Sequence, residues 1–370
     1  MNILIFNWRD IMHPLGGGAE ISLFEHAKYW RKQGANITWI TSSFNGAEKK
    51  ENIEGIRVIR IGSYYTVHIL AYIYFKRHLE KKIDIVIDCF HFIPYFTPLY
   101  IKKSKIIALI NEPAKNAWFK NIFFPASLIG YLSERFFFGF YKNIPFITSA
   151  HSIADELTHY NISSKEIHII PHGVTLGKNK KYSKESVPTI LSLSQLSKDK
   201  GIEDALKTFS ILKKTGKNFN YWIVGKANTK EYREHLKRLA EELAISGKIV
   251  FFGFVSEEEK WKLLSRAWVL IHPSIREGWG LNVIEANSVG TPAVGYNVTG
   301  LKDSIQNMKT GLITSKNTPV NLAEKIKILL TNKELYGKLS RNAIEWSGGF
   351  TWEESGRKSW KLIKTIYEKR

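Results

Sequence analysis

The chain has 370 residues, of which 44% are hydrophobic and 13% aromatic, and its formal net charge is +20 at pH 7. This length is too great for a single hydrophobic core and predicts two domains of ordinary size, while the apolar content excludes a disordered protein. Cys89 is the only cysteine, which excludes an internal disulfide and favours a reducing, cytoplasmic compartment.

The first half of the chain alternates short apolar runs with helical patterns. Residues 3–6 predict a strand, and the following helix carries Ile21, Phe24 and Trp30 on one face. This alternation predicts βαβ units and a Rossmann-like domain over residues 1–178. Further strands are expected at residues 37–40, 57–61, 85–87, 106–110, 146–148 and 168–170.

The second half repeats the alternation more regularly. Strands are expected at residues 189–193, 221–224, 249–252, 268–271 and 293–295, and helices at 201–214, 229–244 and 257–266. Apolar strands separated by helices predict a parallel sheet covered on both faces, which makes residues 187–350 a second Rossmann-like domain. A polar, lysine-rich run ending at Ser186 is the expected linker. An amphipathic helix over about 351–370 is expected to pack back on the first domain.

Two acidic residues flank a glycine-rich passage from a strand to a helix. Glu277 precedes Gly278 and Gly280, and Glu285 lies in the second turn of a helix expected to begin near Gly280. The first amides of a helix have no acceptor within the helix and form its positive dipole end. A ligand there would meet amide donors and carboxylate acceptors together. The plain alternative is a loop acid followed by a solvated helix glutamate.

Two other strand ends carry candidate ligand-binding loops. Gly16, Gly17 and Gly18 directly precede the first helix, and consecutive glycines allow a ligand to approach the backbone closely. A loop that uses glycine only to turn would look the same, and the pattern is neither the dinucleotide-binding motif nor a P-loop. Lys200 follows a strand of the second half, where its ammonium could neutralise a diphosphate or merely begin a helix.

The sequence predicts no metal and no other cofactor. It contains no Asp-x-Asp motif, and its His and Cys residues lack metal-ligand spacing. A nucleoside diphosphate would therefore be bound by basic side chains and helix dipoles. Nucleic acid is not an expected partner, because no helix-turn-helix, zinc-finger or RNA-recognition signature accompanies the positive charge.

Together these features resemble the GT-B glycosyltransferases of family 4, the glycosyl transferases group 1 set, over nearly the whole chain. The most specific part is Glu277-x₇-Glu285, and Gly290-Thr291-Pro292 and residues 7–20 and 88–100 are also similar. The resemblance implies two doubly wound parallel-sheet domains facing across a cleft. It also implies retaining transfer of a hexosyl-type sugar from a nucleotide-sugar donor on the second domain to a glycan or lipid-linked acceptor on the first. A sugar phosphorylase or a sugar-nucleotide epimerase on this fold is the alternative.

The resemblance also implies roles for individual residues. Glu285 would hold the ribose hydroxyls of the donor, Glu277 would contact hydroxyls of the transferred sugar, and Lys200 would stabilise the departing diphosphate. Gly17 and Gly18 would close on that diphosphate from the first domain. The other implied donor-binding positions are Gly225 at the base pocket and the backbone of Gly278, Gly280, Leu281 and Asn282.

Two positions depart from the family pattern. Gln195 stands where the family commonly has an arginine, so Lys200 would carry more of the leaving-group charge. Asn111 stands where the family usually has a histidine, and asparagine can hydrogen-bond a sugar hydroxyl but cannot titrate near neutral pH. Asn111 is therefore a candidate catalytic residue, with His91 or His172 as the alternative source of an imidazole.

Contact with a membrane is left open by the sequence. Residues 3–6 lack the flanks of a signal peptide, and the apolar segment 118–141 is interrupted by charges and by Pro125, so it is not expected to span a bilayer. Aromatic and basic residues in 102–105 and 118–142 suit either an interfacial helix on an anionic membrane surface or a buried domain helix. The expected location is the cytoplasm, with peripheral attachment to the membrane as the open alternative.

Overall fold

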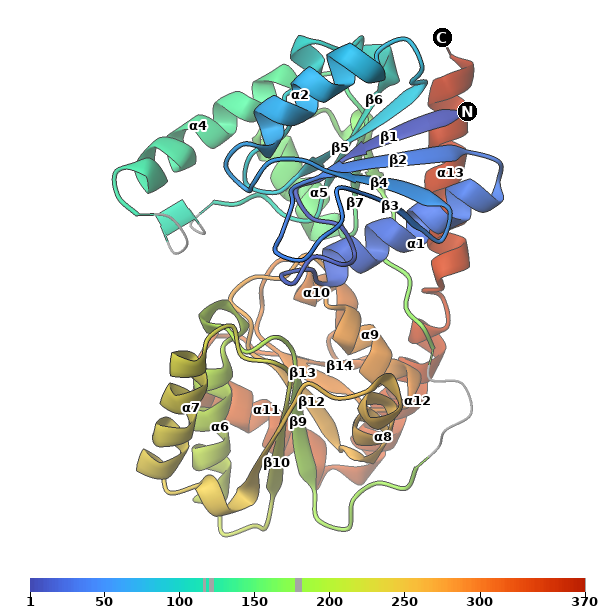
Figure 1. Ribbon diagram of the computed structural model, residues 1–370. Helices are drawn as coiled ribbons and strands as arrows, with labels where there is room; N and C mark the ends of the chain where they lie inside the picture. The colour runs from blue at the N-terminus through green and yellow to red at the C-terminus, as the bar shows by residue number, and fades with distance from the viewer. Residues whose placement is uncertain (116–117, 120–122, 177–181, 370) are drawn as a thin grey trace. The chain divides into compact units, whose positions relative to one another are not determined.

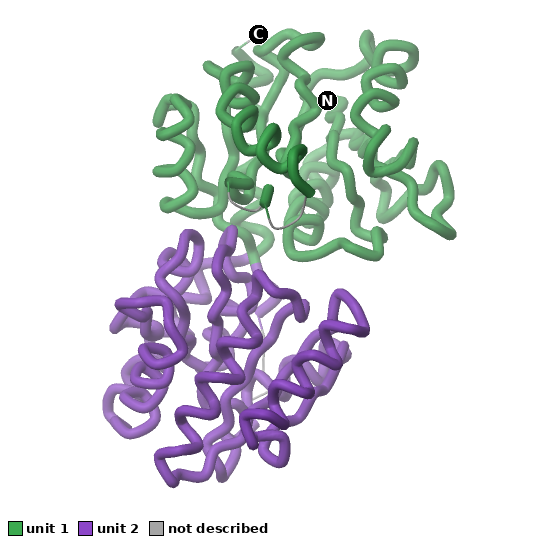
Figure 2. Tube along the Cα trace, turned by 90° about the vertical axis from the view of Figure 1, so that its left-hand side faces the viewer, with its two compact units in different colours: residues 1–173, 352–370 green, residues 174–351 purple. Residues whose placement is uncertain are grey.

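A computed structural model describes residues 1–115, 118–119, 123–176 and 182–369. Its contacts divide the chain into two compact units (Figure 2): unit 1 comprises Met1–Gly173 and Trp352–Arg370, and unit 2 comprises Val174–Thr351. The C-terminal segment therefore belongs to unit 1. Residues 177–181 of the expected linker, with the expected boundary at 178, lie outside the described residues, as do 116–117 and 120–122 near the apolar segment.

Unit 1 is built on a sheet whose described strands follow the order β3-β4-β2-β1-β5-β6-β7-β8. All neighbouring strands run parallel except β3 and β4. The strands are β1 (Asn2–Phe6), β2 (Asn36–Thr41), β3 (Lys50–Ile53), β4 (Ile56–Arg60), β5 (Ile85–Phe90), β6 (Ile106–Ile110), β7 (Phe146–Thr148) and β8 (Ile167–Ile169).

The antiparallel strand β3 is not expected from the sequence. Its four residues are exposed or half-buried, so they carry no apolar run that would reveal a strand. The turn Glu54-Gly55, with φ of 49° and 82°, joins β3 to β4 in the left-handed backbone conformation that suits tight hairpins. The hairpin therefore adds an edge strand that only its pairing with β4 defines.

Helices cover both faces of this sheet (Figure 1). They are α1 (Gly18–Lys32), α2 (Val67–His78), α4 (Ala126–Phe140), α5 (His151–His159) and α13 (Trp352–Glu368). Alternate residues of β1 point to opposite faces: Ile3 and Ile5 join the core under α1 and α13, whereas Leu4 and Phe6 join the core under α2. This double burial explains why the strand reads as an unbroken apolar run.

The terminal helix α13 lies along α1. The indole nitrogen of Trp30 donates to Ser359 Oγ at 2.9 Å, and His26 Nε2 lies 2.8 Å from Ser355 Oγ. A Cβ at Gly356 would lie only 2.5 Å from the Tyr29 ring, so glycine permits this close packing. Residues more than 300 positions apart thus share one core.

Unit 2 contains a parallel sheet of order β11-β10-β9-β12-β13-β14 within the described residues. Its strands are β9 (Thr189–Leu193), β10 (Asn220–Val224), β11 (Ile249–Gly253), β12 (Val269–His272), β13 (Ala293–Gly295) and β14 (Gly311–Ile313). Its helices are α6 (Ile202–Lys213), α7 (Lys230–Glu242), α8 (Glu257–Arg266), α9 (Leu281–Ser288), α10 (Leu301–Ser304), α11 (Pro319–Thr331) and α12 (Lys333–Ser347).

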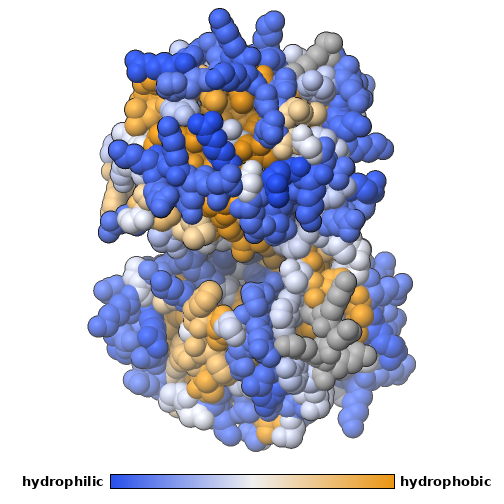
Figure 3. All heavy atoms as spheres, turned by 45° about the vertical axis from the view of Figure 1, so that its right-hand side comes forward, coloured by the Kyte–Doolittle hydropathy of each residue, from blue (hydrophilic) through white to orange (hydrophobic). Residues whose placement is uncertain are grey.

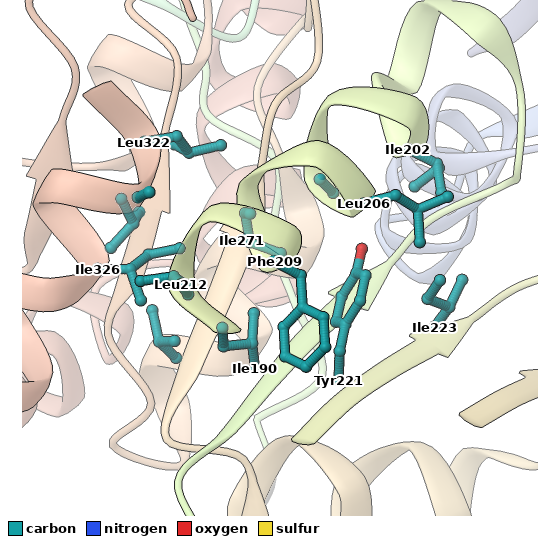
Figure 4. Packing of buried hydrophobic residues seen from close by; sticks show 14 of the residues in the cluster. Ile190, Ile202, Leu206, Phe209, Leu212, Tyr221, Ile223, Ile271, Leu322 and Ile326 are labelled. Carbon is teal, nitrogen blue, oxygen red and sulfur yellow. The ribbon is translucent and has the colours of Figure 1, made fainter. Parts of the chain in front are cut away.

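The core of unit 2 has two layers, one on each face of the sheet. Ile190 of β9 packs with Leu206 and Phe209 of α6 and with α11 (Figure 4), whereas the next residue, Leu191, packs under α8 and α9. Both faces of β9 are therefore buried, as a parallel sheet between helices requires. The predicted class of two doubly wound α/β domains is confirmed.

The surface is mostly hydrophilic on the face drawn in Figure 3, with apolar patches between the polar side chains. Among the described residues, no helix combines the length and the apolarity needed to cross a membrane.

Candidate functional site

Lys200 and Glu277, two of the predicted site residues, form an ion pair. Lys200 ends a 3₁₀ turn, Lys198–Lys200, after β9, and Glu277 lies in the loop between β12 and α9. The Lys200 Nζ atom lies 2.7 Å from Glu277 Oε2, and the two side chains are 23% and 17% exposed. The sequence predicts both residues as site members but does not predict that they form an ion pair.

Backbone contacts hold the two loops together. The amide of Ile275 donates to the Asp199 carbonyl at 3.0 Å, one residue before Lys200. Gly201 has φ of +67°, and a Cβ there would lie 2.1 Å from the Pro273 carbonyl oxygen. Glycine at position 201 is thus required for the approach that brings Lys200 to Glu277.

The ion pair determines the protonation of Glu277. Burial acts to raise the pKa of this carboxyl, but the Lys200 ammonium and His272 outweigh it, so its pKa lies below the ordinary value. Glu277 is therefore ionised at neutral pH. It is a hydrogen-bond acceptor held beside a fixed positive charge.

Glu285 has a different partner, Lys260 of α8, which sequence reasoning missed. Lys260 Nζ lies 2.8 Å from Glu285 Oε1. Burial raises the pKa of Glu285, and Lys260 offsets only part of that effect. In the sequence, Lys260 looks like Lys262, which pairs with Glu259 on the helix surface, so no local signal distinguishes it.

Helix α9 begins at the site, with Gly280 as its N-cap at φ +90°. The Asn282 side-chain amide donates to the Leu193 carbonyl at the end of β9, and Asn282 Oδ1 lies 3.0 Å from His272 Nε2. The Asn282 side chain therefore fixes the start of α9 to β9 and β12. Gly278, Gly280 and Leu281 lie in the same passage, as predicted.

Gly225 and Gln195 lie at neighbouring strand ends. Gly225 follows β10 with φ of +140°, and a Cβ there would lie 1.7 Å from the Ser194 carbonyl oxygen. Gln195 is exposed beside that contact. The predicted residues of unit 2 thus gather at the carboxyl ends of β10, β9 and β12, three adjacent strands, which is where open α/β sheets bind ligands.

Gly17, Gly18 and Asn111 belong to unit 1. Gly17 is the N-cap of α1 and Gly18 is its first residue, and the Gly17 amide donates to Glu20 Oε2 at 2.8 Å. Glu20 also accepts from Arg9, at 3.1 Å. The Gly17 amide therefore already has an anionic acceptor within its own helix turn, a contact that the sequence does not predict.

Asn111 follows β6 and lines a small pocket in unit 1 together with Ser22, Thr148 and His172. His172 Nδ1 lies 2.6 Å from Ser22 Oγ. Burial lowers the pKa of His172 to about 4, so its imidazole is neutral at pH 7. Of the two alternative histidines, His172 shares the Asn111 pocket, whereas His91 packs against Trp8 with ring centroids 5.0 Å apart.

The described residues include no group of three or more His, Cys, Asp or Glu side chains that could hold a metal ion.

Comparison with known proteins matches two families in succession. Residues 16–178 match the family described as Glycosyltransferase Family 4, and residues 176–346 match Glycosyl transferases group 1. An uncharacterized glycosyltransferase of Haemophilus influenzae is 32% identical over 167 residues, which are 45% of this chain and 46% of that protein. The uncharacterized glycosyltransferase MJ1607 of Methanocaldococcus jannaschii is 24% identical over 100% of this chain and 99% of its own length.

Solved structures share the fold over the whole chain. Sucrose-phosphate synthase from Thermosynechococcus elongatus has a TM-score of 0.81 at 16% identity, covering 100% of both chains. Anabaena Alr3699/HepE, solved in complex with UDP-glucose, has a TM-score of 0.73 at 14% identity and covers 99% of this chain and 100% of its own. At these identities the likeness concerns the fold alone.

Proposed function

We propose a function from the family to which the chain belongs, the glycosyltransferases that join a Glycosyltransferase Family 4 domain to a glycosyl transferases group 1 domain. The chain would transfer a hexosyl-type sugar from a nucleoside-diphosphate sugar to a hydroxyl of a glycan or lipid-linked acceptor. The transfer would retain the anomeric configuration. The observation that carries the proposal is the Lys200–Glu277 pair at 2.7 Å beside the start of α9. It supplies a cation for a diphosphate and an ionised acceptor for sugar hydroxyls at one point.

In this proposal Lys200 contacts the diphosphate of the donor and Glu277 contacts hydroxyls of the transferred sugar. Lys200 would then lie between two anions, so its charge is stabilised before and after the donor binds. The first amides of α9, at Gly280, Leu281 and Asn282, would add donors at the positive end of the helix dipole. Gln195 and Gly225 would line the remainder of the donor pocket.

Glu285 would hold the ribose hydroxyls. Its partner Lys260, 2.8 Å away, keeps positive charge beside the half-buried carboxylate, so the carboxylate can accept hydrogen bonds from two neighbouring hydroxyls. In the same proposal, Gly17 and Gly18 approach the diphosphate from unit 1, and Asn111 hydrogen-bonds a sugar hydroxyl. Because His172 is neutral at pH 7, it supplies no charged imidazole to that pocket. This supports Asn111 as the group that hydrogen-bonds the sugar there.

The proposed chemistry is a front-face displacement. The bond between the anomeric carbon and the diphosphate oxygen breaks, the acceptor hydroxyl oxygen bonds to the same face of that carbon, and its proton passes to the departing phosphate. Catalysis then rests on positioning and on leaving-group stabilisation by Lys200 and the α9 dipole, with no metal ion. The single buried, free cysteine Cys89 supports a reducing, cytoplasmic setting.

A thermal-shift screen of nucleotide sugars tests the proposal first. A donor that binds only the native state must raise the melting temperature. UDP-glucose heads the screen because the structural neighbour Alr3699/HepE was solved with it. The matched variant Glu285→Ala should lose the shift, while Glu257→Ala, which removes the other carboxylate on Lys260, should keep it.

Product analysis then identifies the reaction. The protein is incubated with the donor identified in the screen and with a glycan or lipid-linked acceptor. The product should keep the anomeric configuration, α or β, of the donor, and a chelator should leave turnover unchanged. Turnover without an acceptor would indicate an epimerase, and a requirement for free phosphate would indicate a phosphorylase. Inversion of configuration would contradict the retaining mechanism.

A further inference from the structure

Helix α4 exposes a largely uncovered apolar face, on which the one ring contact from outside the helix among the described residues is that of Phe119 with Tyr131, with ring centroids 5.3 Å apart. Ile129, Leu132 and Phe136 are 64%, 65% and 68% exposed, and Phe123 and Phe124, just before the helix, are 92% and 77% exposed. Leu128 and Tyr131 are also exposed and extend the same face, as their helical spacing requires. We call these seven residues the α4 face. Figure 1 shows the first half of α4 standing clear of the sheet of unit 1.

The opposite side of α4 packs against unit 1. The α4 face is therefore not the side through which the helix joins the core of that unit. Glu134 accepts hydrogen bonds from the amides of Ala114 and Lys115, at 2.6 and 2.8 Å, and from the Trp118 indole at 3.2 Å. Phe138 is fully buried and stacks on Phe90 with ring centroids 5.3 Å apart. The helix is therefore anchored through one side while the other side presents its large apolar residues to solvent.

Basic residues accompany the α4 face. Arg135 is exposed between Leu132 and Phe136, and Lys142 is exposed just after the helix. Lys103 Nζ lies 3.5 Å from the Lys142 carbonyl oxygen, so the basic turn Lys103–Lys105 adjoins the same end of α4. In residues 123–142 the sequence has one acidic residue, Glu134, and it is buried.

We propose that the α4 face docks on a lipid bilayer that carries anionic headgroups. The exposed apolar side chains would enter the interface between headgroups and acyl chains, and Arg135, Lys142 and Lys103 would contact the headgroups. In this arrangement α4 lies on the bilayer surface, with its apolar side toward the acyl chains. The docking involves none of the donor-site residues and does not depend on the proposed reaction.

Charge favours a bilayer over a second copy of the chain. A symmetric pair formed through the α4 face would bring the same surface of each copy together. Each copy would then bring the exposed cations Arg135 and Lys142 to the contact, with no exposed carboxylate in residues 123–142 to offset the added positive charge. An anionic lipid surface satisfies both the apolar and the cationic parts of the face.

Docking would also bring the loop after β6 close to the membrane. Glu134 holds residues 114 and 115 of that loop from the inner side of α4, and Asn111 begins the same loop. A lipid-linked acceptor, if it is the substrate, would thus reach unit 1 near Asn111. This consequence rests on the proposed function, whereas the docking itself does not.

Cosedimentation of the full chain with vesicles tests the docking. The chain should bind vesicles of phosphatidylcholine with phosphatidylglycerol at low salt, bind phosphatidylcholine alone much more weakly, and lose binding as salt rises. The double variant Leu132→Ser/Phe136→Ser should lower partitioning by roughly tenfold or more. Arg135→Gln/Lys142→Gln should lower it by roughly tenfold on anionic vesicles and have little effect on neutral ones.

The matched control is Val320→Ser/Ile328→Ser, which removes two exposed apolar residues from α11 of unit 2 and should leave vesicle binding unchanged. All variants should keep their melting temperature and their thermal shift with the donor, which separates failure of docking from failure of the proposed function. Absence of vesicle binding at low salt would overturn the inference. So would a dimer in light scattering that the Leu132→Ser/Phe136→Ser variant dissolves, because the α4 face would then bind a second copy.

Discussion

Lys200 and Glu277, 77 positions apart in the chain, form a 2.7 Å ion pair where β9 and β12 end side by side. The pair is partly exposed, so each partner can also contact a ligand. Lys200 can stabilise a departing diphosphate while Glu277 accepts hydrogen bonds from a sugar. One residue could not perform both roles, because the first needs a positive charge and the second an acceptor.

The Lys200→Ala variant should lose turnover much more than donor affinity. If Lys200 acts on the leaving group, its removal should lower kcat by about 10²–10³, the loss typical of removing one electrostatic contact to developing charge. The dissociation constant of the donor, measured by calorimetry, should rise by less than roughly tenfold. Lys198→Ala in the same turn is the control and should retain activity. Equal losses in kcat and affinity would contradict a transition-state role.

The two site glutamates should respond oppositely to pH. The pKa of Glu277 lies below its ordinary value, so the ionised carboxylate stabilises the folded state. This contribution to the free energy of unfolding is complete above the unfolded-state pKa and is lost as pH falls through the lower folded-state pKa. The pKa of Glu285 is raised by burial, so its folded carboxyl binds a proton more tightly, and stability falls as pH rises from the unfolded to the folded pKa.

Thermal unfolding of Glu277→Gln and Glu285→Gln over a mildly acidic pH series measures this contrast. Relative to the unsubstituted chain, the first variant should lose stability as pH rises and the second should gain it. Glu324→Gln, on the surface of α11, is the control. Parallel pH profiles for the two site variants would contradict a lowered pKa for Glu277 together with a raised pKa for Glu285.

Lys184 should give stability an alkaline pH dependence. Its Nζ donates to the Ala267 carbonyl and to Thr291 Oγ1, both at 2.6 Å, and burial lowers its pKa from 10.5 to about 7. The unfolded chain therefore binds an extra proton between pH 7 and 10.5, so folding becomes more favourable as pH rises through that window. The melting temperature of the Lys184→Met variant should lack this rise, and the exposed control Lys302→Met should keep it. A rise of equal size in both variants would show that other groups cause it.

Asp88 should be a strong determinant of the stability of unit 1. Its buried carboxylate accepts hydrogen bonds from the Tyr95 amide at 3.0 Å, from the Thr97 amide and hydroxyl at 3.2 and 2.6 Å, and from the Tyr141 hydroxyl. Asp88→Asn replaces one acceptor oxygen with a donor that faces these donors. The expected loss is about 2–4 kcal/mol, or roughly 5–15 °C in melting temperature.

Calorimetric unfolding checks the effect of Asp88→Asn, with the exposed Asp155→Asn of α5 as the control. If the Asp88→Asn variant has the same melting temperature as the unsubstituted chain, these hydrogen bonds are replaced without loss of stability.

Much of the fold follows from the sequence because buried parallel strands and amphipathic helices leave local patterns. The apolar runs of β1, β9 and β12 appear within one residue of their predicted positions, since both faces of each strand are buried. Short or exposed elements such as β3 leave no such pattern. Their existence depends on pairing with a neighbour.

The sequence by itself determined the two-domain α/β architecture and the place of Glu277, Gly280 and Glu285 at a strand-to-helix passage, because these depend on residues close together in the chain. Only the tertiary structure decided that Lys200 pairs with Glu277 and Lys260 with Glu285, and that α4 turns its apolar side outward. The order of strands brings distant loops together, and a helix's own pattern shows that it has an apolar face but not what covers it.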